Sequence, residues 1–169
     1  MRVFSLLIPV CAVSAFLLCS CHSAEDPLRS LPLGIVGIEE PVFVTPFASP
    51  FPAKIDTGAD TSSIDAEGIR LIQRDGGKFV SFRIRQRGTG EEHSYELPLK
   101  RRTSIVRHGG KSQTRYIVML TVRIGSLTME REFSLANRKN FSYQVLIGRN
   151  IISGMAAVDP SRRNQTGAL

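Results

Sequence analysis

The sequence lacks tryptophan altogether, and its three cysteines, Cys11, Cys19 and Cys21, all lie within the first 21 residues. A domain that follows them therefore has neither an internal disulfide nor a thiolate ligand for a metal ion. The three histidines are scattered, and the chain contains neither a His-Glu-x-x-His zinc motif nor a glycine-rich nucleotide loop ending in Lys-Ser or Lys-Thr. We therefore expect no metal and no cofactor.

The chain has little acidic charge relative to basic charge, with a formal net charge of +7 over 169 residues. A content of 42% hydrophobic and 22% charged residues is typical of a folded domain and excludes a largely disordered chain. The basic runs at 100–102 and 162–163 have no interleaved aromatic residues on which bases could stack, so we expect no nucleic-acid partner. The basic residues are expected to be solvated, with attraction to an anionic bilayer or envelope polymer as the alternative.

The first 21 residues have the pattern of an export signal. Arg2 is followed by an apolar stretch over residues 3–18, which is short for a spanning helix but suits a signal peptide. The following Leu18-Cys19-Ser20-Cys21 resembles the cleavage box of bacterial lipoproteins. We predict a lipoprotein signal peptide at 1–20, a lipidated Cys21 at the start of a tether over 21–33, and a lipid anchor in the membrane. An ordinary secretory signal, with Cys21 incidental, is the alternative.

The residue after the predicted lipidation site bears on the destination. In the family of bacterial lipoproteins an aspartate there favours retention in the inner membrane, and this chain has His22 instead. We therefore expect a protein of the cell envelope, in the outer membrane if the cell has one.

From residue 34 onward, short apolar and β-branched runs are separated by turn residues. We expect strands at 35–38, 42–44, 53–55, 79–85, 94–99, 115–124 and 127–135, with hairpin turns at 124–127 and at Asp75-Gly76-Gly77. Clean alternation at positions 118 to 124 favours antiparallel β structure, whereas Phe79, Phe82 and Ile84 alternate imperfectly. Only residues 142–154 leave room for a short helix. The prediction is one all-β domain over 34–160, a barrel or sandwich, followed by a tail over 161–169.

The motif that carries chemistry is Asp56-Thr57-Gly58-Ala59, at the end of an expected strand. In an aspartic protease, two carboxyl groups share one proton: one polarises the peptide carbonyl and the other takes a proton from the attacking water. On this model Asp56 is the catalytic residue and supplies one of the two carboxyl groups. Thr57 could hydrogen-bond an opposing loop, Gly58 allows a backbone amide to approach the carboxylate, and Ala59 is small enough to lie under a substrate. Taken alone, the tripeptide is a weak signal, and a plain strand-to-turn corner with Asp as a turn residue explains it better.

A second segment, Leu146-Ile147-Gly148-Arg149-Asn150, favours a catalytic aspartate over a plain turn. Together with the aspartate motif it resembles the retroviral-type pepsins, in which such a segment packs beside the aspartate loop. The resemblance implies a retropepsin-like closed β-barrel, one lobe per chain, with a short C-terminal helix. It also implies an ion pair between Arg149 and Asp60 with a structural role, and such a pair is costly to break when it is buried.

A closer bacterial subfamily, often labelled "putative ATP-dependent zinc protease", resembles nearly all of residues 34–159. It shares Lys-Ile-Asp-Thr-Gly-Ala at 54–59, Arg115-Tyr116, Leu-Ile-Gly-Arg at 146–149 and Val-Asp-Pro at 158–160. The zinc and ATP in that label find no counterpart among the residues of this sequence.

The resemblance also implies a flap, a hairpin that closes over the substrate. The best match is residues 104–111, with Arg107, His108, Gly109 and Gly110 at its tip. The glycines permit positive φ and hinge movement, and the basic residues could contact acidic side chains. A plain exposed hairpin is the alternative.

Because Asp-Thr-Gly occurs once, the second carboxylate must come from Asp56 of another copy, so we expect a homodimer with the site on its two-fold axis. The leading hypothesis is an aspartic endopeptidase at the cell envelope that hydrolyses peptide or protein substrates, including acidic or γ-linked ones. A non-catalytic peptide-binding or scaffold lipoprotein of the same fold is the runner-up. An isopeptidase or amidase that uses Asp56 on γ-linked or poly-acidic chains is a third hypothesis.

Overall fold

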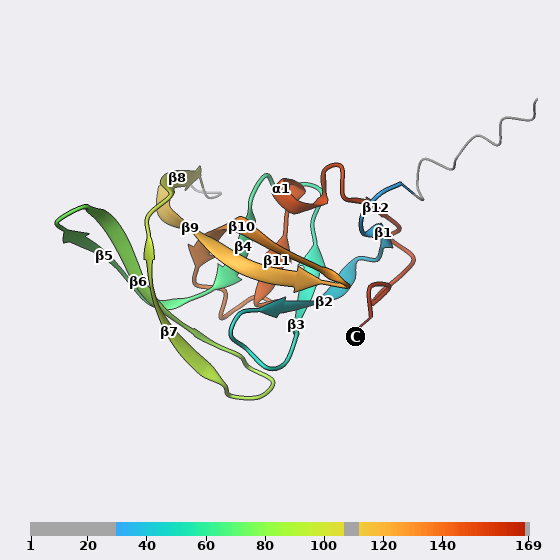
Figure 1. Ribbon diagram of the computed structural model, residues 1–169, viewed down its shortest axis with the longest axis horizontal. Helices are drawn as coiled ribbons and strands as arrows, with labels where there is room; N and C mark the ends of the chain where they lie inside the picture. Colours follow the sequence, from blue (N-terminus) through green and yellow to red (C-terminus); the bar gives the residue numbers. More distant parts are fainter. Residues whose placement is uncertain (1–29, 107–111, 168–169) are drawn as a thin grey trace, which may run out of the picture.

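The computed structural model describes residues 30–106 and 112–167 (Figure 1). Twelve strands and one short helix are present in this part of the chain. In chain order they are β1 (Gly34–Val36), β2 (Glu39–Val44), β3 (Phe51–Ile55), β4 (Ser62–Asp65), β5 (Glu67–Arg74), β6 (Gly77–Arg85), β7 (Glu92–Pro98), β8 (Arg101–Val106), β9 (Ser112–Ile124), β10 (Leu127–Ala136), β11 (Val145–Ile147), α1 (Arg149–Ile152) and β12 (Ala156–Val158).

The central feature is a closed β-barrel. Its strands follow the order β10-β4-β11-β3-β2-β9, and β9 pairs with β10 to complete a ring of six, while β8 continues the sheet beyond β9. The pairs β10–β4 and β11–β3 are parallel, and the remaining pairs of the ring are antiparallel. Closure leaves the ring without an exposed edge. The prediction of an all-β, retropepsin-like closed barrel is confirmed.

The long hairpin β9–β10 forms one wall of the barrel, as its sequence pattern predicts. The alternate residues Val118, Leu120, Val122 and Ile124 are all buried. Ile124 pairs with Leu127 across a two-residue turn that begins at Gly125, whose φ is 55°. Glycine reaches this conformation without the steric cost that a side chain would add.

A separate three-stranded sheet, β5-β6-β7, extends to one side of the barrel (Figure 1). Its first turn is the predicted hairpin, with Arg74 paired to Gly77 around Asp75 and Gly76. The imperfect alternation expected for β6 is a misreading: Val80, Phe82 and Ile84 form a regular buried set, and Phe79 lies on the other face of the strand.

The short helix α1 lies within the 142–154 window, which confirms its prediction. The short strands β4, β11 and β12, and the polar strand β5, were not expected, and only the part of β8 that belongs to the predicted hairpin at 104–111 was. Each has too few apolar residues in alternation to be distinguished from a loop by its sequence. None of the helices in the described ranges is long and apolar enough to cross a membrane.

Residues of the segment assigned to a tail pack against the barrel around Glu40, which is fully buried. Its carboxylate accepts hydrogen bonds from the amides of Gly37 (2.6 Å), Gln165 (3.0 Å) and Thr166 (2.9 Å), and from the hydroxyl of Thr166 (2.8 Å). A Cβ at Gly37 would lie 2.3 Å from the carbonyl oxygen of Arg162, so a side chain there would push this segment away.

Candidate active site

Asp56 stands where β3 leaves the barrel. β3 runs parallel to β11, and the amide of Asp56 donates to the carbonyl of Ile147 at 2.9 Å, which extends the pairing by one residue. The chain then turns, with the amide of Ala59 donating to the carbonyl of Asp56 (3.2 Å). The Asp56 carboxylate is partly exposed and accepts one hydrogen bond, from the amide of Gly58 at 3.0 Å. A Cβ on Gly58 would lie only 3.3 Å from that oxygen, so glycine suits the close approach.

The loop after Asp56 is held by the start of α1. The amide of Arg149 donates to the carbonyl of Ala59 (2.8 Å), and the amide of Asn150 donates to the carbonyl of Asp60 (3.2 Å). Gly148 makes this contact possible, because a Cβ there would lie 2.8 Å from the Ala59 carbonyl oxygen. The two motifs that the sequence analysis singled out are therefore joined backbone to backbone.

The side chain of Asn150 binds the C-terminal end of the same loop, at Ser62. Its side-chain oxygen accepts from both the amide and the hydroxyl of Ser62, each at 2.8 Å, and its side-chain nitrogen donates to the carbonyl of Glu132 at 2.9 Å. The Ser62 hydroxyl also accepts from the amide of Gly148 (3.0 Å). Ser62 is fully buried, so these bonds satisfy polar groups that water cannot reach.

The structure brings Arg149 and Asp60 together as an ion pair, and Arg149 also donates to the carbonyl of Thr57 at 2.8 Å. The predicted pair is therefore present, but it is not buried in the single chain, because the Asp60 side chain is 86% exposed and that of Arg149 is 45% exposed. Solvent screens an exposed ion pair of this kind, so its contribution to the free energy of unfolding is about 0–1 kcal/mol.

Thr57 is exposed and Ala59 is half-buried at the mouth of the loop. The segment predicted to be a flap falls in the β8–β9 hairpin, whose strands are paired as far as Val106 and Ser112, and its role as a flap stays a prediction. The flap residues Arg107, His108, Gly109 and Gly110 lie outside the described residues, as does Cys21 with the whole signal segment.

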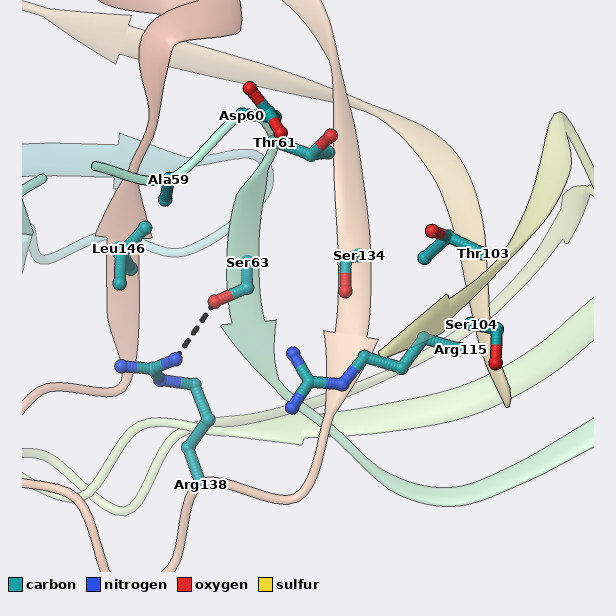
Figure 2. Close-up of a pocket in the computed structure, with 10 residues that line it drawn as sticks. All are labelled: Ala59, Asp60, Thr61, Ser63, Thr103, Ser104, Arg115, Ser134, Arg138 and Leu146. Carbon is teal, nitrogen blue, oxygen red and sulfur yellow. Dashed lines mark hydrogen bonds between the residues drawn. The ribbon is translucent and has the colours of Figure 1, made fainter. Parts of the chain in front are cut away.

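Beside the aspartate loop the barrel opens into a polar cavity of about 440 Å³ (Figure 2). The residues that line it come from the aspartate loop and β4, from the β8–β9 hairpin, and from β10, its following loop and β11: Ala59, Asp60, Thr61, Ser63, Thr103, Ser104, Arg115, Ser134, Arg138 and Leu146. Figure 2 shows Arg115 and Arg138 extending toward the same space from two sides, with the Ser134 hydroxyl directed toward it. Two cations and small polar groups therefore share one recess beside the aspartate loop.

Arg138 is largely buried and is held in place by neutral oxygens. Its guanidinium donates to the hydroxyl of Ser63 (2.9 Å) and to the carbonyl of Tyr143 (3.0 Å). Burial lowers the pKa of Arg138, and the positive charge of Arg115 lowers it further, while Asp65 and then Asp56 act in the opposite direction. The cavity and the aspartate loop are in contact through Ala59, Asp60 and Thr61, which form part of the cavity wall.

Sequence reasoning missed the roles of Ser62, Ser134 and Arg138, since each lies outside the two motifs and none has a distinctive local pattern. Arg115 did stand in a dipeptide quoted for the family resemblance, which was the one available signal. Among the described residues, no group of three or more His, Cys, Asp and Glu side chains could hold a metal ion.

Comparison with known families gives a match over residues 35–167 to the model of the RimB-like family, described as "Retropepsin-like aspartic endopeptidase RimB". A solved structure from Legionella pneumophila, the protein Lpg0085 of unknown function, is similar with a TM-score of 0.67 and 28% sequence identity. That similarity covers 78% of this chain and 97% of the Legionella chain.

Curated relatives carry a different name, "Probable alpha-L-glutamate ligase". The relative from Shewanella pealeana is 35% identical over 111 residues, which is 64% of this chain and 24% of that protein. The relative from Parasynechococcus marenigrum is 31% identical over 138 residues, which is 80% of this chain and 30% of that protein. The chain thus spans roughly a quarter to a third of the length of these relatives.

Proposed function

Because the chain belongs to the RimB-like family of retropepsin-like aspartic endopeptidases, we propose that it hydrolyses peptide bonds with Asp56 as its catalytic carboxylate. The observation that carries the proposal is the position of Asp56. It is partly exposed at a strand end, on a loop fastened to Gly148, Arg149 and Asn150, and its carboxylate accepts one backbone hydrogen bond. Lone pairs remain for water and for a second carboxyl group.

The second carboxyl group is supplied by Asp56 of another copy. Within the described chain, Asp60 is paired with Arg149, and the buried Asp65 is paired with Arg87 (2.7 Å). Neither is free to share a proton with Asp56 in the way that the chemistry requires. A two-fold homodimer brings two copies of the loop together and places the exposed Thr57 where its hydroxyl could bond the opposing loop.

In this dimer, one Asp56 carboxyl keeps its proton and donates a hydrogen bond to the peptide carbonyl. The other carboxylate takes a proton from water as the water oxygen attacks the carbonyl carbon. The carboxyl group that took this proton then donates it to the amide nitrogen, the C–N bond breaks, and the amine leaves. The carbonyl forms again as a hydroxyl of the intermediate returns its proton to the other carboxylate. The proposed location is the cell envelope, on the strength of the signal pattern in residues 1–21.

The test is a mixing experiment with wild type and Asp56→Asn. If each site needs Asp56 from two chains, an equal mixture at constant total protein keeps about one quarter of the wild-type activity, because about one dimer in four contains two aspartates. Independent sites on each chain would leave about one half. Wild type without hydrolysis of either oligo-glutamate or an apolar peptide would contradict the proposal and favour the peptide-binding alternative.

A further inference from the structure

The cavity beside the aspartate loop contains a polar group that the protein itself does not satisfy. Ser134 is 3% exposed, and its hydroxyl has no hydrogen-bond partner in the described part of the chain. Buried hydroxyls are rarely left unpaired, because each one costs free energy. Ser134 pairs in register with Ser63, whose own hydroxyl accepts from Arg138. An oxygen of a ligand placed between Ser134 and Arg138 would complete this network.

The charge of the cavity points to the type of ligand. Among the described residues, no carboxylate lies within ion-pair distance of the Arg138 guanidinium, which is held by the neutral oxygens of Ser63 and Tyr143. The nearby carboxylate of Asp65 is bound instead by the guanidinium of Arg87 at 2.7 Å, and by the Arg138 backbone amide. Arg115 adds a second cation to the same recess, and the carboxylate of Asp60 in its wall is paired with Arg149. Burial and Arg115 both lower the pKa of Arg138, so the cavity is a place where a negative charge is favoured.

The position of the cavity links this charge to the reaction. Its wall includes Ala59, which ends the catalytic motif, and Asp60 and Thr61, which follow it. The other side of the cavity is formed by residues of the β8–β9 hairpin. Because this wall begins three residues after Asp56, we infer that a substrate bound at Asp56 also reaches this opening. A recess of about 440 Å³ has room for an acidic side chain or for the end of a peptide.

We propose that this cavity is a carboxylate-binding subsite of the active site, with Arg115 and Arg138 as specificity-determining residues and the Ser134 hydroxyl as a further donor. The proposal rests on the peptidase function, because it takes the ligand to be part of a peptide. The shared chemistry is a carboxylate, and its source is either an acidic side chain or the C-terminus of the substrate. Arginine guanidinium groups match the geometry of a carboxylate and can bind it through two parallel hydrogen bonds.

The experiment measures peptide binding rather than hydrolysis, so it gives a result even if the chain does not cleave peptides. The full chain with Asp56→Asn is titrated with three short fluorescent peptides. The first has central glutamates and blocked ends, the second has glutamines in their place, and the third is the glutamine peptide with a free C-terminal carboxylate. Titrations extend to about 1 mM peptide.

We expect one of the two carboxylate-bearing peptides to bind at least about tenfold more tightly than the blocked glutamine peptide. Preference for the glutamate peptide identifies a side chain as the source, and preference for the free-ended peptide identifies the C-terminus. Arg115→Gln should remove most of the preference. Ser134→Ala should lower it by a few fold without loss of folding, since the hydroxyl has no partner in the described part of the chain.

The matched control is Arg102→Gln. Arg102 is exposed on β8, pairs in register with Tyr116, and is absent from the cavity lining, so the substitution removes the same charge from the neighbouring strand. Equal binding of all three peptides, or no binding by any of them, would overturn the proposal. Equal losses in Arg115→Gln and Arg102→Gln would also overturn it, since they would indicate diffuse attraction to a basic surface. A wild type that shows the preference but no hydrolysis would instead contradict the peptidase function.

Discussion

Two carboxylates near the same end of the paired strands β2 and β3 have opposite surroundings. Glu40 is fully buried and accepts four hydrogen bonds, three from backbone amides and one from the Thr166 hydroxyl. Asp56 is partly exposed, and its carboxylate accepts one, from the amide of Gly58. The protein satisfies the first carboxylate completely and leaves the second with spare acceptor sites.

The difference separates a structural carboxylate from a reactive one. A carboxylate that is fully hydrogen-bonded in the interior has no capacity left for water or substrate, and its removal leaves buried donors without partners. The position of Asp56 is fixed by the backbone hydrogen bonds of its loop, so its carboxylate oxygens remain accessible. Such a carboxylate can exchange protons with water or with a substrate. We therefore expect substitution of Asp56 to affect activity alone and substitution of Glu40 to affect stability.

The largest effect is expected for Asp56→Asn. Loss of the carboxylate should reduce peptide hydrolysis by on the order of 10²–10⁴ or more, since the amide cannot take a proton from water. The melting temperature should change little, because the bond from Gly58 can still be accepted by the asparagine oxygen. The measurement is a peptidase assay beside a thermal melt, with Asp75→Asn in the exposed β5–β6 turn as the control. An active Asp56→Asn variant would end the catalytic assignment.

Glu40→Gln should produce the reverse result. The glutamine nitrogen would face backbone donors, and we expect a loss of about 2–4 kcal/mol in the free energy of unfolding. The hydrolysis rate per folded molecule should stay close to that of wild type. Urea unfolding measures the free energy of unfolding, and a peptidase assay corrected for the folded fraction measures the hydrolysis rate. Glu130→Gln, an exposed position on β10, is the control. Equal stability of the two variants would show that the buried carboxylate does not hold the C-terminal segment.

Asn150→Ala tests the loop from the second motif. It removes the acceptor for the amide and hydroxyl of the buried Ser62 and should cost about 1–3 kcal/mol of stability. Because the aspartate loop is bound to the same segment, activity should also fall. Asn150→Asp keeps the acceptor oxygen and should restore part of both. If the alanine variant melts like wild type, the loop does not depend on this side chain.

The smallest effect is expected for the Arg149–Asp60 ion pair. Both side chains are exposed, so a double-mutant cycle with Arg149→Gln and Asp60→Asn should give a coupling of about 0–1 kcal/mol in the dilute single chain. Urea unfolding of the four proteins measures it. A coupling above about 3 kcal/mol would indicate that the pair is buried in the species being measured, as a dimer interface would do.

The fold was largely predictable where the pattern is local and regular. Alternation in β9 and the Gly125 turn come from residues next to one another in the chain, so the sequence shows them directly. The three-residue strands β11 and β12 could not be predicted, since strands of that length are defined by their partners in the barrel. For the site, Asp56 and Arg149 were visible because they stand in motifs, whereas Ser134 and Arg138 were not.

By itself, the sequence determined the residue types that the aspartate loop requires, the glycines that allow close backbone contact, and the alternation that builds the barrel. These features depend on neighbours within a few residues. The tertiary structure alone decided that Ser63 would meet Arg138, 75 residues away, that Glu40 would bind Thr166, 126 residues away, and that Arg115 would share a cavity with Arg138. Closing the barrel brings these distant strands together, and only then do their charges and hydrogen bonds have partners.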